Sequence, residues 1–129
     1  MSDTSVIRVL SGIAAVVLLA GTPALGGNAA AGETAFKSKC ATCHTVDKGG
    51  KNGVGPNLFG IAGEKSAQVA GFTKYSAPFK AANITWTDDK LKDWLLAPAK
   101  MVPGTKMILI KPVTPAEADD IIAYLNTKK

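Results

Sequence analysis

The sequence contains very few of the residues that form most metal and catalytic sites. Its 129 residues include two cysteines, one histidine and a single arginine, Arg8. A closed structural zinc site needs four ligands, usually cysteine or histidine, so this chain cannot build one. Nucleic-acid binding usually relies on several arginines and stacking aromatic residues, and aromatic residues make up only 6% of this chain. We therefore expect no zinc site of that kind and no nucleic-acid partner.

The sequence also lacks an apolar run long enough to cross a membrane. The longest run, Val9–Ala20, has about a dozen residues, whereas a helix needs roughly 20 to cross a bilayer core of about 30 Å. Arg8 precedes the run, and the breakers Gly21 and Pro23 follow it. A short apolar run with these flanks is typical of a secretory signal peptide.

The small residues after this run predict where the signal peptide ends. The favoured cut follows Ala24-Leu25-Gly26, which makes residues 1–26 the signal peptide and residues 27–129 the mature domain. Later cuts near Ala29–Ala31 are possible. The alternative is an uncleaved membrane anchor, in which the apolar run continues through Gly26. Export predicts a periplasmic protein.

The mature chain is expected to form one all-α domain. It has no repeats and no internal linker, and its Gly- and Pro-rich stretches 48–63 and 101–113 lack the alternation typical of strands. Asn28 is a plausible N-cap for a helix over Ala29–Cys40, with Gly32 and Phe36 on one face. Glycine costs a helix about 1 kcal/mol relative to alanine, so Gly32 indicates close approach of another helix.

Two further helices are predicted by their capping residues. Thr87 precedes a helix over Asp88–Ala97, and Pro98 stops it. Thr114 and Glu117 form a capping box for the last helix. Its core-facing stripe consists of Ala118, Ile121, Ile122 and Leu125.

The motif Cys40-Ala41-Thr42-Cys43-His44 carries the chemistry of the chain. C-x-x-C-H is the signature of covalent haem attachment. The thiols of Cys40 and Cys43 can add to the two vinyl groups of one porphyrin, and His44 then reaches the iron from the same side. A thioredoxin-like site would need a βαβ context, which the sequence lacks. A plain disulfide between the two cysteines remains the alternative.

The numbers of histidines and methionines in the chain limit the candidates for the second axial ligand of the iron. Because His44 is the only histidine, this chain cannot supply a second one. Once Met1 has left with the signal peptide, Met101 and Met107 remain, and the position is otherwise open or taken by lysine. Met107 follows Pro103-Gly104-Thr105-Lys106 in a loop, where core packing gives little reason for a methionine.

From Gly32 to Leu125 the sequence resembles class I cytochrome c, the mitochondrial-like group that includes soluble bacterial carriers. The matching segments are Gly32 and Phe36, Gly55-Pro56-Asn57-Leu58 with Gly60, Pro103-Gly104-Thr105-Lys106-Met107, and Ile121-Ile122-Ala123-Tyr124-Leu125. The resemblance implies a small cytochrome c fold, with three main helices and long loops around a covalently bound haem c. It also implies that the N- and C-terminal helices cross.

The resemblance further implies the roles of individual residues. Met107 is the implied sixth ligand, and the Pro56 carbonyl accepts a hydrogen bond from His44. Trp86 and Tyr75 are the implied contacts of a haem propionate. Three positions depart from the mitochondrial pattern: Glu64 lies where arginine is common, Trp94 replaces a tyrosine that hydrogen-bonds the methionine sulfur, and Phe79 replaces a frequent asparagine.

The function implied by the resemblance is one-electron transfer by a low-spin His/Met haem, not enzymatic catalysis. Expected donors include a quinol–cytochrome c oxidoreductase, and expected acceptors a terminal oxidase, a reaction centre or a reductase. The net charge of +5 favours acidic docking surfaces. The protein is expected to be monomeric, and four lysines are expected to ring the haem edge: Lys39, Lys51, Lys100 and Lys106.

Overall fold

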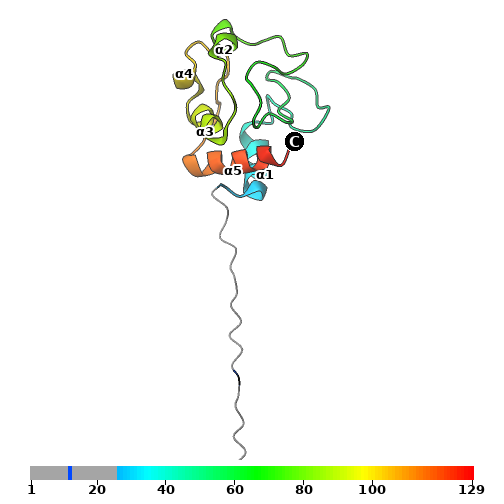
Figure 1. Cartoon of the computed structure of the whole chain (residues 1–129), viewed down its shortest axis with the longest axis vertical. Helices are drawn as coiled ribbons and strands as arrows, with labels where there is room; N and C mark the ends of the chain where they lie inside the picture. The colour runs from blue at the N-terminus through cyan, green and yellow to red at the C-terminus, as the bar shows by residue number, and fades with distance from the viewer. Residues whose placement is uncertain (1–11, 13–25) are drawn as a thin grey trace, which may run out of the picture.

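The computed structural model describes residue 12 and residues 26–129, and the domain is built from helices joined by long loops (Figure 1). The predicted signal peptide falls almost entirely outside the described residues. The helices are α1 (Ala29–Lys39), α2 (Ala77–Ala82), α3 (Asp88–Leu96), α4 (Pro98–Met101) and α5 (Pro115–Asn126). Within the described residues there is no strand, only an isolated antiparallel bridge between Lys65 and Thr85. The all-α prediction is confirmed.

Helix α1 begins where its N-cap was predicted. The Asn28 side chain accepts hydrogen bonds from the backbone N–H groups of Ala30 and Ala31, which satisfies two of the donors that a helix leaves unpaired at its start. The helix ends at Lys39, one residue earlier than expected, and Cys40 is its C-cap. The haem-attachment motif therefore starts directly at the end of α1.

Helix α5 is held at its start by the predicted capping box. The Thr114 side chain accepts from the Glu117 N–H, and the Glu117 carboxylate accepts from the Thr114 N–H. This helix crosses α1 (Figure 1). A Cβ on Gly32 would clash with the Asp120 carbonyl, so only glycine allows this approach. The Phe36 and Tyr124 rings pack beside the crossing, 5.6 Å apart and tilted by 59°.

The middle of the chain contains one predicted helix and two that were missed. The Thr87 side chain accepts from the Lys90 N–H at the start of α3, which ends at Leu96 rather than Ala97. The six residues of α2 and the four of α4 were expected to be loop. Helix α2 buries Phe79 against Trp86 and Trp94, so tertiary packing stabilises a helix too short to form alone.

The described helices are all short. Across residues 26–129, none is long and apolar enough to span a membrane. The buried core is made by α1, α3, α5 and the segments that connect them. Helices α1, α3 and α5 each contribute side chains to the wall of a cavity beside that core.

Candidate functional site

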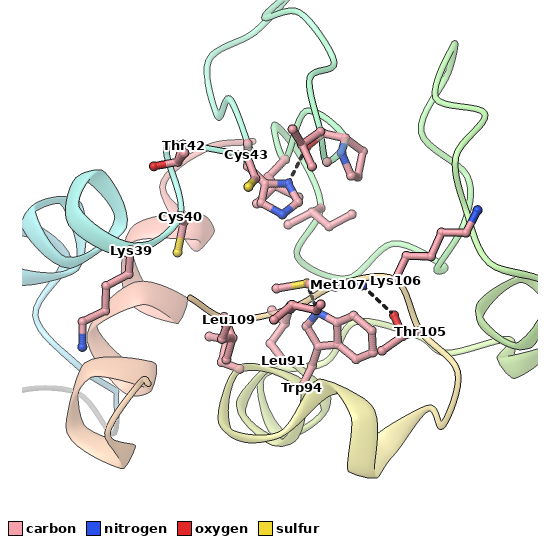
Figure 2. Close-up of a pocket in the computed structure, with 18 of the residues that line it drawn as sticks. Lys39, Cys40, Thr42, Cys43, Leu91, Trp94, Thr105, Lys106, Met107 and Leu109 are labelled. Atoms are coloured by element: carbon pink, nitrogen blue, oxygen red, sulfur yellow. Dashed lines mark hydrogen bonds between the residues drawn. The ribbon is translucent and has the colours of Figure 1, made fainter. Parts of the chain in front are cut away.

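A cavity of about 550 Å³ lies between α1, α3 and the long loops. This volume is within the usual range for a small-molecule or cofactor site. Figure 2 shows Cys40 and Cys43 on one side of it and Met107 with Trp94 on the other. Much of the lining between them is apolar and includes Leu58, Ile61, Phe79, Leu91, Leu95 and Leu109.

The Cys40–His44 motif lies on one wall of this cavity. The N–H groups of Cys43 and His44 both donate to the Cys40 carbonyl, at 3.1 and 3.0 Å. This tight turn brings both cysteines and the imidazole to the same cavity. Both thiols are free, so the alternative of a plain disulfide is not what the structure contains. Burial raises the pKa of the Cys40 thiol to about 11, because a desolvated thiolate is disfavoured.

His44 is fixed in one orientation by the loop that follows. Its Nδ1 lies 2.8 Å from the Pro56 carbonyl oxygen, as the resemblance implied. Since a carbonyl only accepts, Nδ1 carries the proton and Nε2 keeps its lone pair for a metal. Burial lowers the pKa of His44, outweighing the Pro56 hydrogen bond, which favours the neutral imidazole that ligation requires.

Gly55 lets that loop pass close to the imidazole. A Cβ at Gly55 would clash with the His44 ring, and the Gly55 N–H donates to the Cys43 carbonyl at 2.8 Å. The Asn57 side chain fastens the same loop by donating to Thr45 Oγ1 at 2.7 Å and to the Asp47 carbonyl at 3.0 Å. Asn57 belongs to a segment that carries the resemblance, but the resemblance implied no role for its side chain. Its position directly after Gly55-Pro56 was the available signal.

Met107 reaches the cavity from the loop after α4. Gly104 adopts a left-handed backbone conformation, with φ of +88°, which glycine tolerates without strain. The Met107 N–H donates to Thr105 Oγ1 at 3.3 Å. Met101 lies on α4, half-buried against the core, and does not line the cavity. Of the two candidate methionines, the structure therefore brings only Met107 to the site.

Trp94 lies directly beside Met107. Its indole Nε1 donates a hydrogen bond to the Met107 sulfur at 3.0 Å (Figure 2). Trp94 stands where the resemblance has a tyrosine with this contact, and nothing in the sequence indicated that the indole would make the contact itself. Trp94 belongs to a buried aromatic cluster with Phe79 and Trp86.

The two expected propionate contacts, Trp86 and Tyr75, both line the cavity. The Tyr75 hydroxyl accepts from the Val69 N–H at 3.2 Å, and burial raises its pKa. The Tyr75 O–H therefore keeps its proton as a donor at neutral pH. Glu64 is exposed and lies outside this cavity, and its backbone carbonyl accepts from the Trp86 N–H at 2.8 Å.

The predicted lysine ring is only partly supported. Lys51, Lys100 and Lys106 are exposed, and Lys106 lines the cavity. Lys39 instead donates to the Glu117 carboxylate and, at 2.7 Å, to the Pro112 carbonyl. Because its ammonium is already paired within the chain, Lys39 is a poor candidate for attracting a partner. Sequence spacing could not reveal this contact, which joins residues far apart in the chain.

The donor set fits a covalently attached haem. Two thiols and a neutral imidazole lie on one wall, a thioether lies across the cavity, and apolar side chains make up most of the lining between them. The described residues contain no cluster of three or more histidine, cysteine or acidic side chains that could hold a metal ion. His44 and Met107 both line the cavity, and histidine and methionine are side chains that can ligate haem iron.

Comparison with known proteins gives one consistent result. Residues 29–129 match the family model described as Cytochrome c. Cytochrome c from Gossypium barbadense is 48% identical over 100 residues, covering 78% of this chain and 89% of that protein. Cytochrome c from Chlamydomonas reinhardtii is 46% identical, covering 78% of this chain and 88% of that protein.

A solved structure agrees with the sequence relatives. Cytochrome cH from Methylobacterium extorquens superposes with a TM-score of 0.71 at 47% identity, covering 79% of this chain and all of that one. Members of this family are electron carriers rather than enzymes, and they bind covalently attached haem c. Cys40 and Cys43 are positioned for that attachment. The chain therefore belongs to the cytochrome c family and has the class I fold.

Proposed function

We propose that this protein is an exported one-electron carrier whose haem iron is bound by His44 on one face and by Met107 on the other. Cys40 and Cys43 attach the haem. The observation that supports this ligation best is the pairing across one cavity. His44 has only Nε2 left as a donor atom, and Met107 is the only other histidine or methionine that lines the cavity among the described residues.

The bound haem supplies the exchange between ferrous and ferric iron, and the chain supplies the conditions for it. If His44 and Met107 both held the iron, no coordination site would be left for a substrate. The apolar lining limits access of water to the cavity. Hydrogen bonds to His44 and to Met107 hold both side chains in place, so little rearrangement should accompany a change of charge. Methionine as an axial ligand favours a high reduction potential.

Carbon monoxide binding tests this ligation. The ferrous wild-type protein should bind little carbon monoxide at neutral pH, because both axial positions are taken. Met107→Ala should open one position and bind it readily. Met101→Ala is the matched control and should behave like the wild type. Strong binding by the wild type would contradict the proposal and favour a haem enzyme with an open site.

The mouth of the cavity is the proposed docking surface. Val54, Ile108 and Ile110 line it and are 72%, 81% and 76% exposed. Lys74, Lys106 and Lys111 also line it, and all three are exposed. Positive charge around an apolar centre suits an acidic redox partner. The donors and acceptors expected above, a quinol–cytochrome c oxidoreductase and an oxidase, reaction centre or reductase, fit this description.

Salt dependence tests the electrostatic part of this docking surface. The association rate constant with the redox partner should fall as ionic strength rises, because salt screens the attraction. The double variant Lys74→Gln/Lys106→Gln should weaken that dependence, whereas Lys39→Gln should change it less. An association rate constant that does not change over this range of ionic strength would contradict electrostatic attraction of the partner.

Export and cleavage after Gly26 complete the proposal. Gly27 lies against the backbone of Asp119 and Asp120, and the Asn28 N–H donates to the Asp120 carboxylate at 2.7 Å. A cut after Gly26 would keep these contacts, whereas a cut within 29–31 would remove the N-cap of α1. The intact mass of the periplasmic protein should therefore correspond to a chain that begins at Gly27. A mass that includes Met1 or Ser2 would favour the membrane-anchored alternative.

A further inference from the structure

One residue beyond the end of α5, Lys128, holds the loop 47–60 at both of its ends. The Lys128 carbonyl accepts a hydrogen bond from the Gly60 N–H at 2.6 Å. The Lys128 ammonium lies 3.2 Å from the Asp47 carboxylate. Asp47 begins the loop and Gly60 ends it, and the loop carries the Pro56 carbonyl that faces the imidazole. A single residue therefore anchors the loop on which the orientation of the imidazole depends.

Lys128 is itself held in place by α5. Its N–H donates to the Leu125 carbonyl at 3.0 Å. Its ammonium lies 5.3 Å from the centre of the Tyr124 ring, which is within the range of a cation–π contact. Tyr124 is buried and packs on Phe36 beside the crossing of α1 and α5. The contacts of Lys128 therefore join the loop 47–60 to that crossing.

The support continues from Asp47 toward His44. The Asp47 carbonyl accepts a hydrogen bond from the Asn57 side chain at 3.0 Å, and Asn57 directly follows Pro56. The Pro56 carbonyl oxygen lies 2.8 Å from His44 Nδ1. A hydrogen bond of this kind fixes the ring orientation of a ligating histidine. A continuous series of contacts and peptide bonds thus runs from Lys128 to the imidazole.

We propose that Lys128 is a positioning residue that keeps the Pro56 carbonyl against His44 Nδ1. This inference rests on the proposed ligation of iron by His44. When the Lys128 ammonium is removed, the loop loses its anchor at Asp47 and opens locally more often. Each opening lets the His44 Nδ1–H exchange with water. The Asp47 side chain is 83% exposed, and exposed ion pairs contribute modestly, so the expected effect is a change of a few fold.

Hydrogen exchange of the His44 Nδ1–H, followed by NMR in the ferrous haem-loaded protein, tests this role. Lys128→Gln removes the charge and should speed the exchange by about twofold to fivefold, the range for one exposed ion pair. Lys128→Arg keeps the charge and should exchange like the wild type. The matched control is Lys129→Gln, at an exposed neighbouring lysine, which should also exchange like the wild type. Unchanged exchange in Lys128→Gln would overturn the proposal.

The variant Asp47→Asn tests whether the effect passes through the ion pair. It should speed exchange at His44 about as much as Lys128→Gln does. The double variant Lys128→Gln/Asp47→Asn should exchange no faster than either single variant, because both changes remove the same interaction. Effects that multiply in the double variant would mean that Lys128 and Asp47 act independently, which would overturn the proposal.

The Phe36 N–H distinguishes this role from general stabilisation of the fold. Phe36 lies in α1 and is 3% exposed, so its exchange should need global unfolding, which denaturant promotes strongly. His44 should exchange through local opening of the loop, with little dependence on denaturant. A merely structural Lys128 would, when changed to glutamine, speed exchange at Phe36 and leave it unchanged at His44. That result, or equal denaturant dependence at both groups, would overturn the proposal.

The NMR spectrum of the same ferrous samples separates a failure of this proposal from a failure of the ligation. The ring protons of an iron-bound His44 lie over the haem and should be shifted strongly upfield by its ring current. If the wild type lacks this shift, the ligation by His44 fails and the role of Lys128 fails with it. If the shift is present and Lys128→Gln exchanges at the wild-type rate, the role of Lys128 is overturned while the ligation stands.

Discussion

The α1/α5 crossing and the cavity side of this domain are stabilised in different ways. At the crossing, polypeptide packs directly on polypeptide: Gly32 lies against the Asp120 backbone, and Phe36 packs on Tyr124. On the other side, loops surround about 550 Å³ of space. At the crossing, the two helices pack on each other, whereas the loops around the cavity are arranged to pack on a cofactor. This difference leads to three predictions.

The largest effect should come from preventing haem attachment. The double variant Cys40→Ala/Cys43→Ala leaves the cavity walls without a covalently held packing partner. At roughly 24 cal/mol per Å³, an unfilled cavity of this size would cost up to about 13 kcal/mol, comparable with the whole stability of a small domain. Amide hydrogen exchange should lose most of its protection in residues 40–63 and 101–113.

The same hydrogen-exchange experiment tests whether the α1/α5 crossing and the loops around the cavity differ in stability. Residual protection should be concentrated in α1 and α5, because these two helices pack directly on each other. The haem-loaded wild type is the reference. If protection were lost equally in the helices and in the loops, the two regions would not be energetically distinct.

A smaller effect is expected from Gly32→Ala at the crossing. Alanine favours a helix by about 1 kcal/mol over glycine. Its Cβ would nevertheless clash with the Asp120 carbonyl and crowd the Tyr124 side chain. The net result should be a loss of about 2 kcal/mol in the free energy of unfolding, measured by denaturant titration of the haem-loaded protein.

The matched control for Gly32→Ala is Gly53→Ala. A Cβ at Gly53 would lie 3.4 Å from the Cys43 carbonyl oxygen, which is ordinary contact. This variant should change the free energy of unfolding by much less. If Gly32→Ala proved as stable as the wild type, the close approach of the two helices would not be what selects glycine.

The smallest effect should come from Glu117→Gln, which removes a pH-dependent contribution to stability. The Lys39 ammonium and then the Thr114 N–H lower the pKa of the Glu117 carboxyl. The carboxylate therefore stabilises the folded state above its unfolded pKa, and this contribution is lost as pH falls through the lower folded pKa. Glu117→Gln should lower the melting temperature at neutral pH, and the difference should shrink in acid.

Glu33→Gln provides the comparison for Glu117→Gln. Glu33 also has a lowered pKa, caused mainly by Lys37, but that ion pair lies within α1. Its loss should have less effect, because it joins no separate elements. A difference between Glu117→Gln and the wild type that stayed constant with pH would contradict the assigned origin of the stabilisation.

Capping residues in the sequence predicted α1, α3 and α5 correctly. Asn28, Thr87 and Thr114 act as N-caps, as predicted. Helices α1 and α3 each end one residue before the predicted end. Helix α5 extends past its predicted core stripe and ends at Asn126. Helices α2 and α4 were missed because they are too short for a periodic pattern. Ser76 followed by Pro78 was the available signal for α2, since the Ser76 hydroxyl caps the Phe79 N–H.

For the candidate site, the sequence predicted the candidate ligands but not all of the contacts around them. The Cys40–His44 motif and residue counting reduced the ligand choice to a few side chains, and the cavity contains those the resemblance implied. The pairing of Lys39 with Glu117 and the bond from Trp94 to Met107 were not foreseen. Both join residues on different elements, and their geometry depends on how those elements pack.

The most direct test of the account is the optical spectrum of the oxidised haem-loaded protein, because the account depends on Met107 as the iron ligand opposite His44. The far-red methionine–iron charge-transfer band should be present in the wild type, absent in Met107→Ala and retained in Met101→Ala. A band that survived in Met107→Ala, or that was missing from the wild type, would contradict the proposed His44/Met107 site.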